Sequence, residues 1–231
     1  MSVDAICTSS KCSPVSPANG DFCVLEGFTS QVHALRLGNN KLPINPPTDY
    51  KPHPNLKRVR KGLVIINTGN GKGKTTAGFG MMLRAWGRGM NTMAVQFIKS
   101  EKSKYGEQMA AEKIGIEMIP AGRGFSWTSK DLSEDEALAQ NGWRIAKEKI
   151  ASGDYDVIML DEITYPVSWG WIDVDELLEV IESKPEMLNL IITGRDAHSK
   201  LVEVADLVTE MKEIKHPYAD QGIPAQKGVE F

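Results

Sequence analysis

A stretch rich in glycine and lysine holds the residues with the clearest chemical potential. It reads T-G-N-G-K-G-K-T-T at 68–76, between an apolar run at 63–66 and a segment with apolar residues at helical spacing. Glycine lets the main chain curl so that successive N–H groups point inward, and the start of a helix adds partial positive charge. This pattern predicts an ATP-binding phosphate loop formed by Gly69, Asn70, Gly71, Lys72, Gly73, Lys74, Thr75 and Thr76.

Two side chains of this loop have distinct predicted roles. Lys74 places a full positive charge on the phosphates and is a candidate catalytic residue, whereas the Thr75 hydroxyl is a candidate ligand of Mg²⁺. The loop departs from the common G-x-x-x-x-G-K-[S/T] pattern, because Thr68 stands at the first glycine position and glycine follows one residue later. We therefore expect a variant phosphate loop, and the alternative is a glycine-rich turn whose lysines occur by chance.

A pair of carboxylates is the second candidate. Asp161 and Glu162 directly follow the apolar residues 157–160, which describes a buried strand that delivers acids to the edge of a sheet. In P-loop enzymes such an acid holds Mg²⁺ directly or through water. Alone, the pair could be a solvated acidic turn. Together with the phosphate loop, it predicts a metal site that includes Thr75.

Two arginines are further candidates for nucleotide binding. Arg195 follows another apolar run, and its guanidinium suits phosphate oxygens, although a structural ion pair is an equally good interpretation. Arg84 lies nine residues beyond Thr75 on the predicted helix and faces either the nucleotide or solvent.

The aromatic residues Phe125 and Trp127 lie in a glycine-containing loop after a predicted strand at 117–119. Loop aromatics ordinarily pack onto the core, but this position could instead place both rings at the ligand edge of the sheet. We expect Trp169 and Trp171 to pack beside the following helix.

The elements that must position these residues alternate between short apolar runs and longer amphipathic segments. Runs of four or five apolar residues bounded by polar turns are typical of buried parallel strands. The predicted helices include one at 134–150 with Ser133 as its N-cap and Glu136 completing a capping box. The sequence predicts a doubly wound α/β fold with a mostly parallel sheet, of the RecA-like P-loop type, with ligands at the carboxyl ends of the strands. The predicted strands are 63–66, 93–97, 117–119, 157–160, 188–192 and 207–211, and the other helices are 75–87 and 173–181.

Residues 1–58 differ from the rest and are predicted to be an irregular arm that precedes a domain at 59–231. Seven of the 12 prolines occur there, a density that favours an extended chain over a regular helix. The three cysteines, Cys7, Cys12 and Cys23, are also in this segment and do not have the paired spacing of a zinc site.

Composition sets limits on location and partners. The formal net charge of −3 at pH 7 gives no basic face for nucleic acid. No apolar run approaches the roughly 20 residues needed to span a bilayer, and the N-terminus lacks the apolar core of a secretion signal. We expect a cytoplasmic protein with neither a membrane nor a nucleic-acid partner.

Several sequence blocks together resemble one family, the P-loop corrinoid adenosyltransferases that act on cob(I)alamin or cob(I)yrinic acid a,c-diamide. The resemblance extends from about residue 56 to 231. Besides the phosphate loop, it rests on V-Q-F-I-K at 95–99, G-F-S-W at 124–127, L-D-E-I-T-Y at 160–165, I-I-T-G-R at 191–195, A-D-L-V-T-E-M at 205–211, K-H-P at 215–217 and the closing A-Q-K-G-V-E-F.

The resemblance implies transfer of the 5′-deoxyadenosyl group of ATP to cobalt(I) of a reduced corrinoid, with release of triphosphate. It implies that Thr75 and Glu162 bind Mg²⁺ or Mn²⁺ with Asp161 in support, and that Phe125 and Trp127 lie under the corrin and exclude solvent. It further implies a homodimer and an electron donor that reduces cobalt. The residues agree with this chemistry, since cobalt(I) is the nucleophile and no protein base is required.

Two other functions remain open at this point. An ordinary P-loop kinase or ATPase would cut at the γ-phosphate and yield ADP instead of triphosphate. A non-enzymatic module, such as a recombinase-like filament subunit or a nucleotide sensor, would bind ATP without group transfer.

Overall fold

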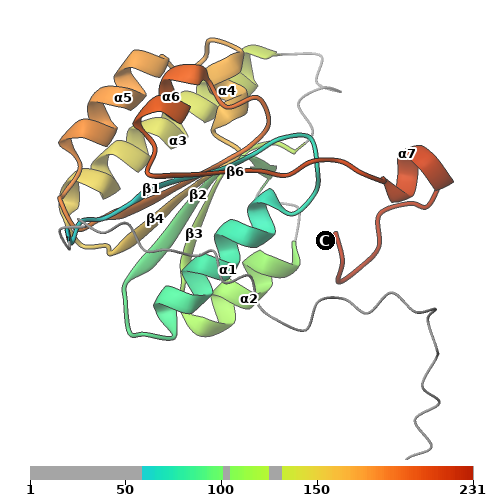
Figure 1. The fold of residues 1–231 in the computed structure, drawn as a ribbon, viewed down its shortest axis with the longest axis horizontal. Helices are drawn as coiled ribbons and strands as arrows, with labels where there is room; N and C mark the ends of the chain where they lie inside the picture. The colour runs from blue at the N-terminus through green and yellow to red at the C-terminus, as the bar shows by residue number, and fades with distance from the viewer. Residues whose placement is uncertain (1–58, 101–104, 125–131, 231) are drawn as a thin grey trace, which may run out of the picture. The chain divides into compact units, whose positions relative to one another are not determined.

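Parallel strands alternate with crossover helices in this computed structural model, which describes residues 59–100, 105–124 and 132–230 (Figure 1). The predicted arm, 1–58, lies outside the described residues. Residues Met1–Leu56 and Lys57–Phe231 separate into two units, and the described residues all belong to the second. The six-stranded sheet has the order β3-β2-β4-β5-β1-β6. The strands are β1 (Val64–Thr68), β2 (Thr92–Ser100), β3 (Glu117–Gly122), β4 (Val157–Asp161), β5 (Asn189–Thr193) and β6 (Leu207–Glu210).

Every pairing in this sheet is parallel, which confirms the predicted α/β class. Helices α1 (Lys74–Trp86) and α2 (Gly106–Ile114) cover one face (Figure 1). The other face carries α3 (Leu132–Ser152), α4 (Thr164–Ser168), α5 (Val174–Ser183) and α6 (Ser199–Val204), and α7 (Pro217–Gln221) lies in the C-terminal segment beyond the sheet.

Consecutive residues of β1 and of β4 pack into two different hydrophobic clusters, one on each face of the sheet. Ile65 and Met159 belong to the cluster on the α1 face, whereas Ile66 and Leu160 belong to the cluster on the α3 face. Both faces are buried because helices cover both, which explains why the strands are apolar at consecutive positions. Each fully buried side chain of this size contributes about 1.5–3 kcal/mol.

Two predicted details differ from the structure. Helix α3 begins at Leu132, so Ser133 lies in its first turn and is not its N-cap. The apolar run at 207–211 predicts a buried strand, but all four residues of β6 are exposed. The reason is its place at the edge of the sheet, where it pairs only with β1.

In the described part of the chain, none of the helices has the length and apolar character that crossing a bilayer requires.

Candidate active site

The phosphate loop connects β1 to α1 and is held by the segment that follows β6. The Gly71 N–H donates to the Met211 carbonyl oxygen at 2.6 Å, and the Met211 N–H donates to the Thr68 carbonyl oxygen at 2.7 Å. Gly69 has a φ of 93°, and a Cβ there would lie 2.5 Å from the Met211 oxygen. Glycine is therefore required at this position by both conformation and space.

The first turn of α1 is left open for an anion. Its N-cap, Gly73, has a φ of 106° and offers no side-chain acceptor, and the first turn contains no acidic residue. The first N–H groups of a helix have no partner within it, and the helix dipole adds partial positive charge at this end. Phosphate oxygens are suitable acceptors for these groups.

Positive side chains converge on the same loop. The Lys74 ammonium donates to the Gly71 carbonyl oxygen at 2.7 Å. Burial, and then the neighbouring positive charge of Arg195, lower the pKa of Lys74. Lys72 also lowers this pKa, whereas Glu162 raises it. Cations that repel one another in the absence of ligand gain stability when a polyanion lies between them.

Asp161 ends β4 and accepts from side chains of three other elements. Its Oδ1 accepts from the Thr75 hydroxyl at 2.8 Å and the Thr193 hydroxyl at 2.7 Å. Its Oδ2 accepts from the Gln96 amide at 2.9 Å and lies 3.4 Å from the Lys99 ammonium. With both oxygens occupied, this fully buried carboxylate orients Thr75 and is poorly placed to ligate a metal ion directly.

Glu162 has a different environment from its neighbour. Its φ of 63° is in the left-handed region, uncommon for a residue with a side chain. Its N–H donates to the Thr193 hydroxyl at 2.9 Å, which supports the turn. Burial, and then the charge of Asp161, raise the pKa of Glu162 to about 7. A cation beside this carboxyl would favour its ionised form.

The oxygen donors at this edge fit a hard cation such as Mg²⁺. Thr75 and Glu162 supply a hydroxyl and a carboxylate, and Asp161 fixes the hydroxyl. Within 59–100, 105–124 and 132–230, no group of three or more His, Cys, Asp or Glu side chains could hold a metal ion. Mg²⁺ that arrives with a nucleotide ordinarily takes only one or two protein carboxylates and fills its other positions with phosphate and water.

The sequence did not predict a buried polar network in which side chains of β2 and α2 hold Asp161 in place. Lys99 forms ion pairs with Asp161 and Glu107, and the Gln108 amide donates to the Gln96 oxygen at 2.7 Å. Burial alone would lower the pKa of Lys99, but Asp161 and Glu107 outweigh it and the pKa is raised. The signal in the sequence was Gln96 inside the predicted strand 93–97, with Lys99 two residues beyond its end.

The other predicted residues fall into three groups. Asn70 and Thr76 are exposed on the phosphate loop and the first turn of α1. Arg84 is exposed in the last turn of α1, and at 1.5 Å per residue it lies about 15 Å along the helix from the loop. Phe125 and Trp127 lie outside the described residues.

The C-terminal segment returns to the phosphate loop. The Lys72 ammonium and the Glu230 carboxylate form an ion pair at 2.6 Å, in which Lys72 is half exposed and Glu230 is mostly buried. One cation of the loop is therefore paired with a carboxylate of the C-terminal segment.

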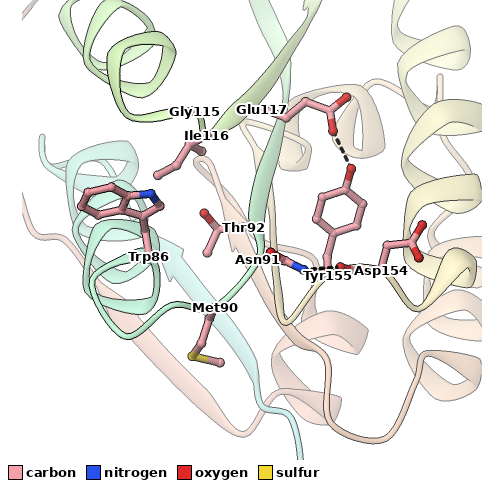
Figure 2. Close-up of a pocket in the computed structure, with 9 residues that line it drawn as sticks. All are labelled: Trp86, Met90, Asn91, Thr92, Gly115, Ile116, Glu117, Asp154 and Tyr155. Atoms are coloured by element: carbon pink, nitrogen blue, oxygen red, sulfur yellow. Dashed lines mark hydrogen bonds between the residues drawn. The ribbon is translucent and has the colours of Figure 1, made fainter.

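A hollow of about 450 Å³ lies far from this chemistry, at the amino-terminal ends of β2 and β3 (Figure 2). Trp86 and Met90 line it together with Glu117 and Tyr155, whose hydroxyl donates to the Glu117 carboxylate at 2.5 Å. None of the predicted site residues lines it. In open α/β sheets the ligand crevice lies at the carboxyl ends of the strands. Asp161 is at the carboxyl end of β4, so the region around it is the candidate active site.

The sequence of the chain is similar to known proteins. Residues 60–231 match the family described as ATP:corrinoid adenosyltransferase BtuR/CobO/CobP. A corrinoid adenosyltransferase of Sinorhizobium sp. is 44% identical over 76% of this chain and 83% of its own length. Those of Pseudomonas aeruginosa and Escherichia coli K12 are 39% and 37% identical, over 75% and 74% of this chain and 86% of their own lengths.

The solved structure of flagellar accessory protein FlaH from Methanocaldococcus jannaschii has a TM-score of 0.45 with 15% identity, over 66% of this chain and 72% of that one. The residues matched by the family include the phosphate loop, Asp161 and the C-terminal segment that contacts the loop. The chain therefore belongs to the ATP:corrinoid adenosyltransferase family.

Proposed function

We propose that this protein transfers the 5′-deoxyadenosyl group of ATP to cobalt(I) of a reduced corrinoid and releases triphosphate. The observation that carries the proposal is the phosphate loop with its converging cations beside the Thr75–Asp161 hydrogen bond. Family membership supplies the corrinoid as the second substrate.

In the proposed reaction, the electron pair of cobalt(I) attacks C5′ of ATP. The cobalt–carbon bond forms as the bond from C5′ to the first phosphate oxygen breaks. Cobalt becomes formally cobalt(III), and triphosphate leaves with the electron pair of the broken bond. No protein residue has to remove a proton, so the protein must align the two substrates and stabilise charge on the leaving group.

The described residues support those two tasks. The open first turn of α1 and the ammonium of Lys74 lie where the triphosphate would bind, and Arg195 adds a second positive charge. Thr75 and Glu162 would hold Mg²⁺ or Mn²⁺, which would neutralise part of the triphosphate charge.

The rest of the proposal rests on the resemblance alone. In it, Phe125 and Trp127 lie under the corrin and exclude water, a separate electron donor reduces the cobalt, and the protein acts as a homodimer. The cytoplasmic location is a separate expectation, drawn from the composition of the sequence.

An ATPase or kinase is the second candidate, because one observation favours it. Glu162 has a pKa raised to about 7, which suits a residue that accepts a proton from an attacking water or hydroxyl group. Such an enzyme would cut at the γ-phosphate and produce ADP.

Product analysis tests the proposal. The protein is incubated with ATP, Mg²⁺ and chemically reduced cobalamin, the carbon–cobalt product is followed by absorbance, and the phosphate products are separated. We expect equal amounts of alkylated corrinoid and triphosphate, and Lys74→Ala as the control should make little of either. ADP that forms without carbon–cobalt product would show that the second candidate is correct.

A further inference from the structure

The turn that follows β5 has an uncommon main-chain conformation around Arg195. Gly194 has a φ of 138° and Asp196 has a φ of 50°, so a residue with a positive φ stands on each side of the arginine. A Cβ at Gly194 would lie 2.0 Å from the Thr164 hydroxyl oxygen. A positive φ at a residue with a side chain persists where the surroundings impose it. The contacts of this turn therefore decide where Arg195 is placed.

Elements on both sides of β5 hold the turn. On the β4 side, the buried Thr164 hydroxyl donates to the Arg195 carbonyl oxygen at 2.6 Å. On the β1 side, the Gly194 N–H donates to the Asn67 carbonyl oxygen at 3.3 Å. Both contacts exist because β5 lies between β4 and β1 in the sheet. The turn is thus attached to the end of the strand that leads into the phosphate loop.

Thr68 joins this turn to the phosphate loop itself. Its hydroxyl oxygen accepts from the Ala197 N–H at 3.2 Å, and its carbonyl oxygen accepts from the Met211 N–H at 2.7 Å. It stands where the common pattern has its first glycine, but it still belongs to β1, and the positive φ of the loop comes at Gly69. A glycine at position 68 would leave the Ala197 N–H without this acceptor. The departure from the common pattern therefore supplies a contact between the loop and the turn that carries Arg195.

The side chain of Arg195 is available to a ligand. It is exposed, and its guanidinium forms no hydrogen bond or ion pair with any residue of 59–100, 105–124 or 132–230. The structural ion pair that the sequence left open is therefore not found in this part of the chain. Burial, and then the charge of Arg195, lower the pKa of Lys74, so the guanidinium lies near the ammonium of the phosphate loop.

We infer that Thr68 is a positioning residue that acts through Arg195, because its hydroxyl fixes the turn from which the guanidinium reaches the triphosphate. The inference rests on the ATP-binding part of the proposed function. Adenosyl transfer releases the whole triphosphate, so negative charge has to be stabilised along all three phosphates. The phosphate loop supplies cations from β1 and α1, and the turn after β5 supplies one from a neighbouring strand. The hydrogen bond from Ala197 to Thr68 fixes the positions of these two groups relative to each other.

A double-mutant cycle in full-length protein tests the inference. The Kd for ATP is measured by calorimetry with Mg²⁺ and without corrinoid. Arg195→Gln should weaken ATP binding about tenfold or more, because a charge-assisted hydrogen bond to phosphate is lost while the main-chain contacts of the turn remain. Thr68→Val keeps the shape of the side chain without its oxygen and should weaken binding about fivefold. In the Arg195→Gln background, Thr68→Val should change the Kd less than about twofold, since its effect passes through Arg195.

Three further variants separate positioning from a structural role. Thr68→Ser keeps the hydroxyl and should recover most of the affinity. Thr209→Val makes the same change at an exposed residue of β6 and is the matched control, with an unchanged Kd. Tm reports whether each variant is folded, and a purely structural role would lower Tm without changing the Kd for ATP. If Thr68→Val is not folded, Thr68→Ala replaces it in the cycle with the same expected outcomes.

Three results would overturn the inference. The first is an unchanged Kd for ATP in folded Thr68→Val or Arg195→Gln. The second is an effect of Thr68→Val that is as large in the Arg195→Gln background as in the wild type, which would show that Thr68 acts independently of Arg195. The third is the same loss in Thr209→Val. Failure of the proposed function is distinct from all three, because the wild-type protein would then bind ATP but form no carbon–cobalt product.

Discussion

Glu162 should make the ligand-free protein less stable as pH rises, and Glu162→Gln should remove this dependence. Burial and the charge of Asp161 raise the pKa of Glu162 from 4.5 to about 7. In the unfolded chain the carboxyl is in water and titrates at its ordinary value. Between these two pH values, the unfolded chain has released a proton that the folded protein still holds.

The sign and the size follow from this difference. Since the folded state binds more protons in this window, the free energy of unfolding decreases as pH rises through it. A separation of roughly 2.5 pH units, at about 1.36 kcal/mol per unit, corresponds to about 3 kcal/mol. That stability is present below pH 4.5 and is lost above about pH 7. In a folded unit of this size it is equivalent to roughly 6–12 °C in Tm.

Urea denaturation at about pH 4.5 and about pH 8, with EDTA and without nucleotide, measures the effect. Glu162→Gln should exceed the wild type by about 3 kcal/mol at the higher pH and nearly match it at the lower one. Glu179→Gln, a change to an exposed carboxyl on α5, is the control and should follow the wild type. If Glu162→Gln and the wild type lose the same stability between the two pH values, the reasoning about Glu162 is wrong.

Four further substitutions test other parts of the site. Lys74→Ala should lower turnover by about two orders of magnitude or more in a folded protein, because a charge that stabilises the transition state is lost; near-normal turnover would contradict this. Gly69→Ala should abolish ATP binding in a calorimetric titration, since its Cβ would meet a main-chain oxygen at 2.5 Å. Lys99→Met should cost about 3–5 kcal/mol in urea denaturation, because Asp161 loses a buried partner. Trp127→Ala should slow adenosylation from cobalt(II) more than from preformed cobalt(I), and equal losses in both assays would exclude a role under the corrin.

Local patterns were sufficient to predict the fold class and the two main motifs. A phosphate loop needs its glycines and lysine within one continuous stretch, and Asp161 follows its apolar strand directly. The carboxyl ends of parallel strands all lie on the same side of the sheet. The phosphate loop and Asp161 each follow or end such a strand, so the two motifs are expected to meet. The Thr75–Asp161 hydrogen bond confirms that expectation.

Features that depend on strand order could not be predicted in this way. The contact between Gln96 and Asp161 joins residues 65 positions apart, and it exists because β2 lies beside β4. Sequence periodicity shows that a strand is apolar but does not identify its neighbours. For the same reason the exposure of β6 could not be predicted. Its apolar residues suggest burial, but the strand lies at the edge of the sheet. Trp169 and Trp171 are two residues apart, yet only Trp171 packs against the core.

The arrangement around β1 has a consequence for the order in which the protein becomes functional during synthesis. Strand β1 is the first of the sheet to be made, but both of its neighbours, β5 and β6, are the last. The hydrogen bond from the Leu63 N–H to Asn189 joins residues 126 positions apart. The phosphate loop is then held by Met211, just beyond the final strand. A nascent chain that still lacks β6 has neither the outer partner of β1 nor the main-chain clamp on the loop, so the phosphate loop can take up its final arrangement only after Met211 has been synthesised.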